Sequence, residues 1–191
     1  MPTRLYRNLA NLLTVARLLL TPFIVVAVLH GHRRQAFALA CVAGVSDAVD
    51  GLVARRLRAT TRFGAYLDPV ADKALLVSLY IAFAVAHILP FWLVGIVLGR
   101  DALILGMVAW GMLFTRVRTF PPTIWGKIST FTQIAAVVVL LADARPYVSR
   151  RLVLGSIALT SVWSGLHYAA RGIQMLKADR KERIDGGAKQ A

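Results

Sequence analysis

Long apolar stretches alternate with short polar connectors along the whole chain. An α-helix needs about 20 predominantly apolar residues to cross the hydrocarbon core of a bilayer, since each residue advances it by about 1.5 Å. The stretches are long enough for this, and the short connectors favour antiparallel neighbours. The pattern therefore predicts six transmembrane helices, over residues 12–29, 36–57, 66–86, 91–114, 124–141 and 152–170.

The composition points to the same class of protein. Hydrophobic residues make up 58% of the chain and charged residues 17%, whereas soluble domains are about 25% charged. We expect an all-α, polytopic integral membrane protein with a single domain over residues 1–191. Within it we expect a juxtamembrane segment over residues 1–10 and a flexible basic tail over residues 177–191. The lone Cys41 excludes an intrachain disulfide and a cysteine-cluster metal site.

The charge balance is strongly basic, with a net charge of +14. No aromatic–basic motif for RNA accompanies this charge, so we expect no nucleic-acid partner. In a membrane protein such charge serves topology and contacts with anionic head groups. The basic residues concentrate near the N-terminus, in the second and fourth connectors and in the tail. The positive-inside rule then places both termini, and the second connector, on the cytoplasmic side of the cell membrane.

Four aspartates flank that second connector: Asp47, Asp50, Asp68 and Asp72. On helices, spacings of three and four residues put each pair on one face, where like charges repel. Carboxylates at membrane depth are also costly, so something must neutralise them. Pairing with connector arginines, a proton or cation pathway, and binding of divalent metal are the three explanations.

Metal binding accounts for most of the pattern. Two divalent cations would balance the charge of about −4, and oxygen-only ligands favour Mg²⁺ or Mn²⁺. Two such ions can stabilise the attacking and leaving oxygens of a phosphoryl displacement. Gly51 and Gly64 would let a ligand approach closely, and the fork of Arg55 suits a phosphate. A transporter would instead spread its carboxylates through the membrane depth, and a lipid-binding scaffold gives no reason for four aligned aspartates.

The stretch DAVDGLVARRLRATTRFGAYLDPVAD, from Asp47 to Asp72, resembles the signature of the CDP-alcohol phosphatidyltransferases at every fixed position. The opening NLLTVARLLLTP, from Asn11 to Pro22, resembles the first helix of that family. The resemblance implies a six-helix membrane enzyme with the CDP-alcohol phosphotransferase fold, typically a homodimer. It also implies the reaction, in which an acceptor alcohol displaces CMP from CDP-diacylglycerol.

Roles for individual residues follow from the resemblance. The four aspartates would ligate two divalent cations, Mg²⁺ or Mn²⁺. Asp72 would also be the general base for the acceptor hydroxyl, with Asp68 beside it in the catalytic centre. Positions that match contacts to the CDP part of the donor, or that close over it, are Asn11, Thr14, Gly51, Arg55, Thr61 and Gly64.

The later motifs bear on the acceptor. GRDALILG, from Gly99 to Gly106, and PTIWGKISTFTQ, from Pro122 to Gln133, look like the cardiolipin synthases of the family, which use phosphatidylglycerol. Phosphatidylglycerophosphate synthases share the second motif but usually carry glutamate where Asp101 stands and arginine where Val108 stands. We expect phosphatidylglycerol as acceptor, with glycerol 3-phosphate as the alternative.

Candidate acceptor contacts are Arg100, Asp101, Arg116, Arg118 and Lys127. Two of these assignments have structural alternatives. Arg100 and Asp101 would equally form an ion pair that stabilises the fourth helix, and Lys127 would serve as an interfacial anchor.

Overall fold

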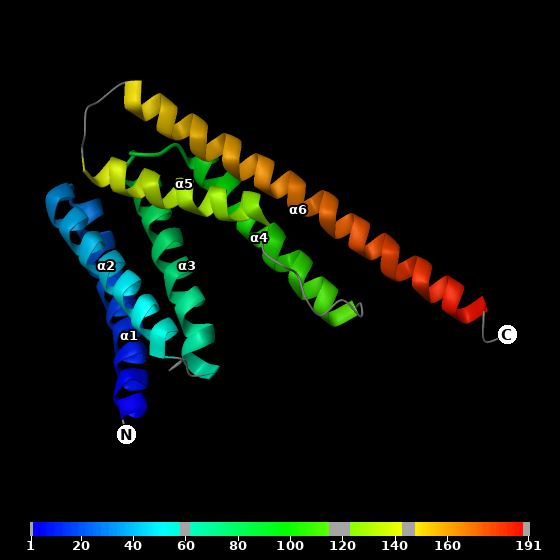
Figure 1. Cartoon of the computed structure of the whole chain (residues 1–191). Helices are drawn as coiled ribbons and strands as arrows, with labels where there is room; N and C mark the ends of the chain where they lie inside the picture. Colours follow the sequence, from blue (N-terminus) through cyan, green and yellow to red (C-terminus); the bar gives the residue numbers. More distant parts are fainter. Residues whose placement is uncertain (1, 58–61, 115–122, 143–147, 189–191) are drawn as a thin grey trace. The chain divides into compact units, whose positions relative to one another are not determined.

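The computed structural model describes the backbone of residues 2–57, 62–114, 123–142 and 148–188, and the side chains of residues 14–46, 71–111, 123–142 and 150–174. Over these residues the chain forms helices and short turns, with no strand (Figure 1). The helices of this described part are α1 (Pro2–Leu29), α2 (Arg33–Leu57), α3 (Arg62–Val85), α4 (Phe91–Phe114), α5 (Ile124–Leu141) and α6 (Val148–Ala188).

The predicted helices are confirmed, two of them residue for residue. α4 and α5 have the predicted bounds, and α2 and α3 begin three or four residues earlier than expected. α1 joins the predicted juxtamembrane segment and the first span in one continuous helix. α6 continues to Ala188 through the segment predicted as a flexible tail. Lys, Arg and Ala, which have high helix propensity, occupy six of the twelve positions from Lys177 to Ala188.

Within the described residues, three helical segments are long and apolar enough to cross a membrane: Phe91–Gly111, Ile124–Leu141 and Arg150–Gln174. Thr14–Leu29 is a shorter apolar helix. Large apolar side chains point outward from them, with Leu19 63%, Phe131 73% and Leu159 72% exposed. In water such exposure would be unfavourable, so these faces suit lipid. The protein is an all-α membrane protein.

The chain packs as two compact units. Unit 1 comprises Met1–Pro90 and Val137–Pro146, and unit 2 comprises Phe91–Ala136 and Tyr147–Ala191. In unit 1, α1 packs against both α2 and α3 (Figure 1). In unit 2, α4 packs along α6. A single domain over residues 1–191 stays a prediction.

The buried face of α1 changes character along the helix. Its buried positions Thr14, Arg17, Thr21, Ile24 and Val28 recur every three or four residues, the spacing of one helical face. The first three are polar and the last two are apolar. The polar half lies within unit 1, so those side chains are turned toward protein instead of lipid.

A tight turn joins α1 to α2 and makes them antiparallel. Gly31 adopts a positive φ of 74°, and the His32 N–H donates to the Ala27 carbonyl at 2.8 Å while the Gly31 N–H donates to the Val28 carbonyl at 3.1 Å. These two bonds form a Schellman motif, which favours glycine at the left-handed position. The turn sends α2 back alongside α1, toward the segment that carries Asp47 and Asp50.

Candidate active site

The structure places the predicted metal ligands on two helices of unit 1. Asp47 and Asp50 lie in α2, and Asp68 and Asp72 lie in α3. Of the four, Asp72 has a described side chain, and the other three side chains lie outside the described residues. Most predicted donor contacts also have side chains outside the described residues: Asn11, Gly51, Arg55, Thr61 and Gly64. For Thr61 the backbone lies outside the described residues as well.

Asp72 is bound to an arginine from another helix. Arg17 Nη1 of α1 donates to Asp72 Oδ1 at 2.6 Å. The two partners differ in burial, because the Arg17 side chain is 3% exposed and the Asp72 side chain is 48% exposed. A charge-assisted hydrogen bond of this length is among the stronger polar contacts in proteins. The carboxylate is thus held from the protein side while it stays open to ligands from outside.

Two threonines accompany Arg17 on the buried face of α1. Thr14, a predicted donor contact, is 3% exposed and lies one turn before Arg17. Thr21 lies one turn after it, and its Oγ1 donates to the Arg17 carbonyl at 2.9 Å. A buried polar surface therefore runs along α1 up to the contact with Asp72.

The sequence carries a signal for Arg17 outside the aspartate motif. A charged residue in an apolar stretch of spanning length is rare, and it usually faces the interior of the bundle with a partner. Arg17 meets that description, and Asp72 is the partner. It is a residue of the site that pattern matching to the aspartate motif missed.

The chemistry of the donor set fits a divalent cation. Asp72 offers a half-exposed carboxylate. The three other predicted ligands are also aspartates and lie in α2 and α3. Oxygen ligands of this kind suit Mg²⁺ and Mn²⁺. Among the described residues no three His, Cys, Asp or Glu side chains gather, since Asp47, Asp50 and Asp68 are outside that set. The two-metal cluster stays a prediction.

In unit 2 the candidate acceptor residues Arg100 and Asp101 form a buried ion pair. Arg100 Nη1 donates to Asp101 Oδ1 at 2.7 Å, and the two side chains are 7% and 9% exposed. The guanidinium also donates to the Ser164 hydroxyl oxygen on α6 and to the Gly126 carbonyl on α5. Arg100 thus connects α4, α5 and α6. This supports a structural role for the Arg100–Asp101 ion pair, and contact of Arg100 with an acceptor stays a prediction.

The contacts around Arg100 explain part of the motif from Pro122 to Gln133, namely its glycine, Gly126. A Cβ at Gly126 would lie 3.0 Å from Tyr168 Cε2 and 3.3 Å from Arg100 Nη2, so a side chain there would crowd both. Tyr168 Oη accepts the Thr123 N–H at 3.0 Å, and Thr123 Oγ1 accepts the Gly126 N–H at 3.1 Å. Glycine therefore favours the close approach of α5 to the Tyr168 and Arg100 side chains.

The remaining motif residues divide between the interior and the surface. Gln133 is 1% exposed, and its Nε2 donates to the buried hydroxyls of Ser129 and Ser161 at 3.5 Å. Lys127 is exposed, as a phosphate contact or an interfacial anchor would both require. Arg116 and Arg118 lie outside the described residues.

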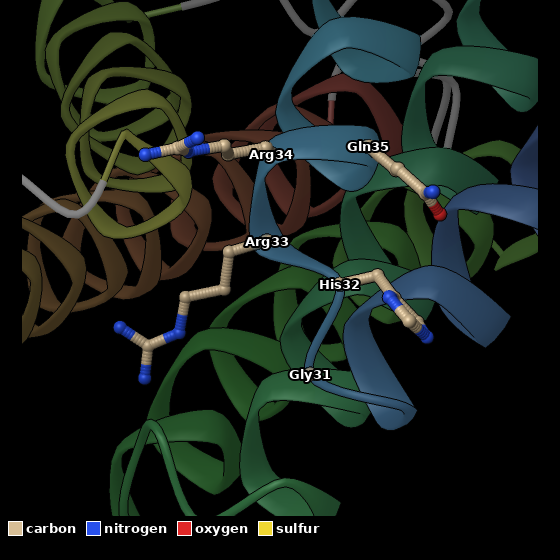
Figure 2. Close-up of a pocket in the computed structure, with 5 residues that line it drawn as sticks. All are labelled: Gly31, His32, Arg33, Arg34 and Gln35. Carbon is tan, nitrogen blue, oxygen red and sulfur yellow. The ribbon is translucent and has the colours of Figure 1, made fainter.

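A hollow of about 480 Å³ lies at the turn between α1 and α2, lined by Gly31, His32, Arg33, Arg34 and Gln35. Figure 2 shows Arg33 and Arg34 extending to one side of the turn while His32 and Gln35 extend to the other. The hollow is also roughly 20 Å from Arg17 along α1, at about 1.5 Å per residue. Its side chains do not converge on a ligand, and it is separate from the aspartate site.

The family model for CDP-alcohol phosphatidyltransferase matches residues 7–164. The chain belongs to the CDP-alcohol phosphatidyltransferase family. The match begins before Arg17 in α1 and ends within α6, so it includes both helices that carry the aspartates. The enzyme class expected from the aspartate motif is confirmed, and divalent cations are a general requirement of the family.

Relatives of this phosphatidyltransferase carry two kinds of name. A probable phosphatidylglycerophosphate synthase of Mycobacterium tuberculosis is 33% identical over 175 residues, covering 87% of this chain and 82% of the relative. A CDP-diacylglycerol–glycerol-3-phosphate 3-phosphatidyltransferase of Pseudomonas fluorescens is 33% identical, covering 93% and 96%. A putative cardiolipin synthase of Mycobacterium bovis is 40% identical, covering 63% of this chain and 58% of the relative.

Proposed function

We propose that this phosphatidyltransferase moves the phosphatidyl group of CDP-diacylglycerol to glycerol 3-phosphate. The observation that carries the choice of acceptor is the extent of similarity. The glycerol-3-phosphate 3-phosphatidyltransferase of Pseudomonas fluorescens aligns over 93% of this chain, whereas the putative cardiolipin synthase aligns over 63%. The products would be phosphatidylglycerophosphate and CMP.

The reaction is a single displacement at phosphorus. The acceptor hydroxyl oxygen attacks the phosphatidyl phosphorus, the bond to the CMP oxygen breaks, and CMP leaves with the electron pair. Asp72 accepts the proton of the attacking hydroxyl, a role for which its half-exposed carboxylate is suited. An alcohol is too weak a nucleophile to attack unaided, so a positioned base contributes about 10²–10⁴ in rate.

Divalent cations complete the proposed site. Asp47, Asp50, Asp68 and Asp72 would hold two ions, Mg²⁺ or Mn²⁺. When bound, the ions would screen the diphosphate and stabilise charge on the departing CMP. The open side of Asp72 supports this assignment, because a ligand to a shared ion must be accessible from the site.

Phosphatidylglycerol is the second candidate acceptor, giving cardiolipin. Two residues of α4 favour it. Asp101 replaces the glutamate usual in phosphatidylglycerophosphate synthases, and Val108 stands where they carry an arginine. A phosphorylated acceptor is best held by several cationic donors, and Arg100 already has Asp101, Ser164 and Gly126 as partners. If glycerol 3-phosphate is the acceptor, the exposed Lys127 would have to supply the positive charge that the related synthases have in the arginine at the position of Val108.

Sidedness and assembly complete the proposal. The basic residues near the N-terminus, in the second connector and in the tail support a cytoplasmic site in a multi-pass cell-membrane protein, with both termini cytoplasmic. A site on that side lets soluble CMP leave while acyl chains stay in lipid. The family resemblance supports a homodimer.

The test of the acceptor uses the purified protein in detergent with Mg²⁺ and labelled CDP-diacylglycerol. Glycerol 3-phosphate and phosphatidylglycerol are offered in separate reactions, and lipid product is followed together with CMP. Phosphatidylglycerophosphate from the first reaction alone supports the proposal. Cardiolipin from the second alone overturns it in favour of the second candidate. Val108→Arg is the matched variant, and it should improve the KM for glycerol 3-phosphate without changing that for phosphatidylglycerol.

A further inference from the structure

We propose that Arg17 is a positioning residue, which fixes the carboxylate of Asp72 in the orientation that catalysis needs. This inference rests on the proposed function of Asp72. Its basis is the 2.6 Å contact from Arg17 Nη1 to Asp72 Oδ1, which joins α1 to α3 inside unit 1. None of the roles derived above for the aspartate motif includes a residue of α1 that acts on the carboxylate.

The unequal burial of the two partners distinguishes this pair from a structural ion pair. Arg17 is 3% exposed and Asp72 is 48% exposed. The other buried pair of the molecule's described part, Arg100 and Asp101, is enclosed on both sides at 7% and 9%. The Asp101 carboxylate is therefore closed to ligands, as suits a pair that stabilises the fold. Leaving the Asp72 carboxylate open while its partner is enclosed suits a group that must also meet a ligand.

The surroundings of Arg17 explain how it holds its direction. It lies on the buried face of α1 between Thr14 and Thr21, so its long side chain cannot turn outward to lipid without leaving that face. The Thr21 hydroxyl binds the Arg17 carbonyl, which adds a local contact at the same turn. A planar guanidinium on one carboxylate oxygen limits rotation of the whole carboxylate group.

Arg17 also carries a positive charge next to the proposed cation site. Its removal should therefore make Asp72 a better ligand for a divalent ion, because a nearby like charge is lost. At the same time the carboxylate loses the contact that orients it toward the acceptor hydroxyl. Tighter metal binding combined with slower turnover is a signature that loss of packing alone would not produce.

The experiment compares wild type with Arg17→Gln, Arg17→Lys and the matched control Ile24→Val, a buried apolar position on the same face of α1. Mn²⁺ binding to substrate-free protein is measured from the free-ion signal in electron paramagnetic resonance, and kcat, KM and the unfolding midpoint are measured in parallel. For Arg17→Gln we expect kcat to fall by about 10²-fold, a near-unchanged KM for CDP-diacylglycerol, and Mn²⁺ affinity raised by about threefold or more. Arg17→Lys should recover part of kcat, and Ile24→Val should leave kcat and Mn²⁺ affinity as in wild type.

A background of Asp72→Asn separates failure of this inference from failure of the proposed function. There the effect of Arg17→Gln on Mn²⁺ affinity should be smaller, because the part that passes through the Asp72 carboxylate is lost while the direct repulsion between Arg17 and the ion remains. If wild type is active and Asp72→Asn is inactive, but Arg17→Gln keeps wild-type kcat or only lowers the unfolding midpoint, the positioning role is wrong and the base role stands. If Asp72→Asn is as active as wild type, the proposed function of Asp72 fails first.

Discussion

Arg100 donates two hydrogen bonds to a single acceptor, the hydroxyl oxygen of Ser164, from Nε at 3.2 Å and from Nη2 at 2.9 Å. This contact links α4 to α6 at a point where both side chains are buried. A buried guanidinium needs partners for its donors, and here Ser164, Asp101 and the Gly126 carbonyl supply them. The cluster is the polar centre of unit 2.

Removing Arg100 should therefore destabilise the protein strongly. In Arg100→Met the Asp101 carboxylate stays buried without its cation, and such a change costs about 3–5 kcal/mol. Ser164→Ala removes one neutral acceptor and should cost about 1–2 kcal/mol. Thermal unfolding in detergent measures both. An unchanged midpoint for Arg100→Met together with lost activity would show that Arg100 acts on the acceptor instead of on the fold.

A side chain at Gly126 should destabilise the protein. In Gly126→Ala the new methyl group would sit 3.0 Å from Tyr168 Cε2 and 3.1 Å from Tyr168 Oη, so we expect a loss of about 1–3 kcal/mol from overpacking. Gly155→Ala in α6 is the matched control, since nothing lies within 4 Å of its Cβ. The control should stabilise the helix by about 0.5–1 kcal/mol. Equal unfolding midpoints for the two variants would contradict the packing described at Gly126.

His87 should be improved by replacement with glycine. It lies in the turn just after α3, in the left-handed region at φ 56°, and the Ile88 N–H donates to the Phe83 carbonyl at 2.8 Å. A residue with a Cβ pays about 1–2 kcal/mol for that conformation, so His87→Gly should raise the unfolding midpoint. Gly31→Ala, at φ 74°, is the reciprocal change and should lower it. The same sign for both substitutions would contradict the assigned turn geometry.

Opposite ends of the predicted topology should differ in access from outside the cell. Single cysteines at Arg34 and at Lys189, each in a Cys41→Ser background, serve as probes. Cys41 must be replaced because it is exposed. A membrane-impermeant maleimide on intact cells should label Arg34→Cys and spare Lys189→Cys, and lysis should expose the second. The reverse pattern would place the tail, and with it the proposed site, on the outer side.

The sequence pattern predicted helix positions well for a physical reason. The bilayer imposes a length and an apolar composition on every span, and both are visible in a single sequence. α4 and α5 were placed to the residue for this reason. The start of α1 and both ends of α6 were not, because helical segments outside the hydrocarbon core depend on local helix propensity. The run from Lys177 to Ala188 is one case.

The site was predicted where chemistry depends on residue type and spacing, and missed where it depends on contact. Four carboxylates at fixed offsets indicated a metal site without knowledge of the packing. The partnership of Arg17 with Asp72 joins positions far apart in the chain, so no local pattern contains it. The small space at Gly126 in α5 likewise results from Tyr168, which lies in another helix, α6. Contacts between helices are what the sequence pattern leaves out.

The most direct test of the central claim is CMP release from CDP-diacylglycerol by wild type and Asp72→Asn. The assay contains Mg²⁺ and glycerol 3-phosphate, and an EDTA control is run alongside. Asparagine keeps the size of the side chain but can neither accept the proton nor bind a cation as a charged ligand. We predict Mg²⁺-dependent release by wild type and a loss of about 10²-fold or more in the variant, with the variant still folded in detergent. Release by Asp72→Asn at the wild-type rate, or by wild type in excess EDTA, would contradict the account.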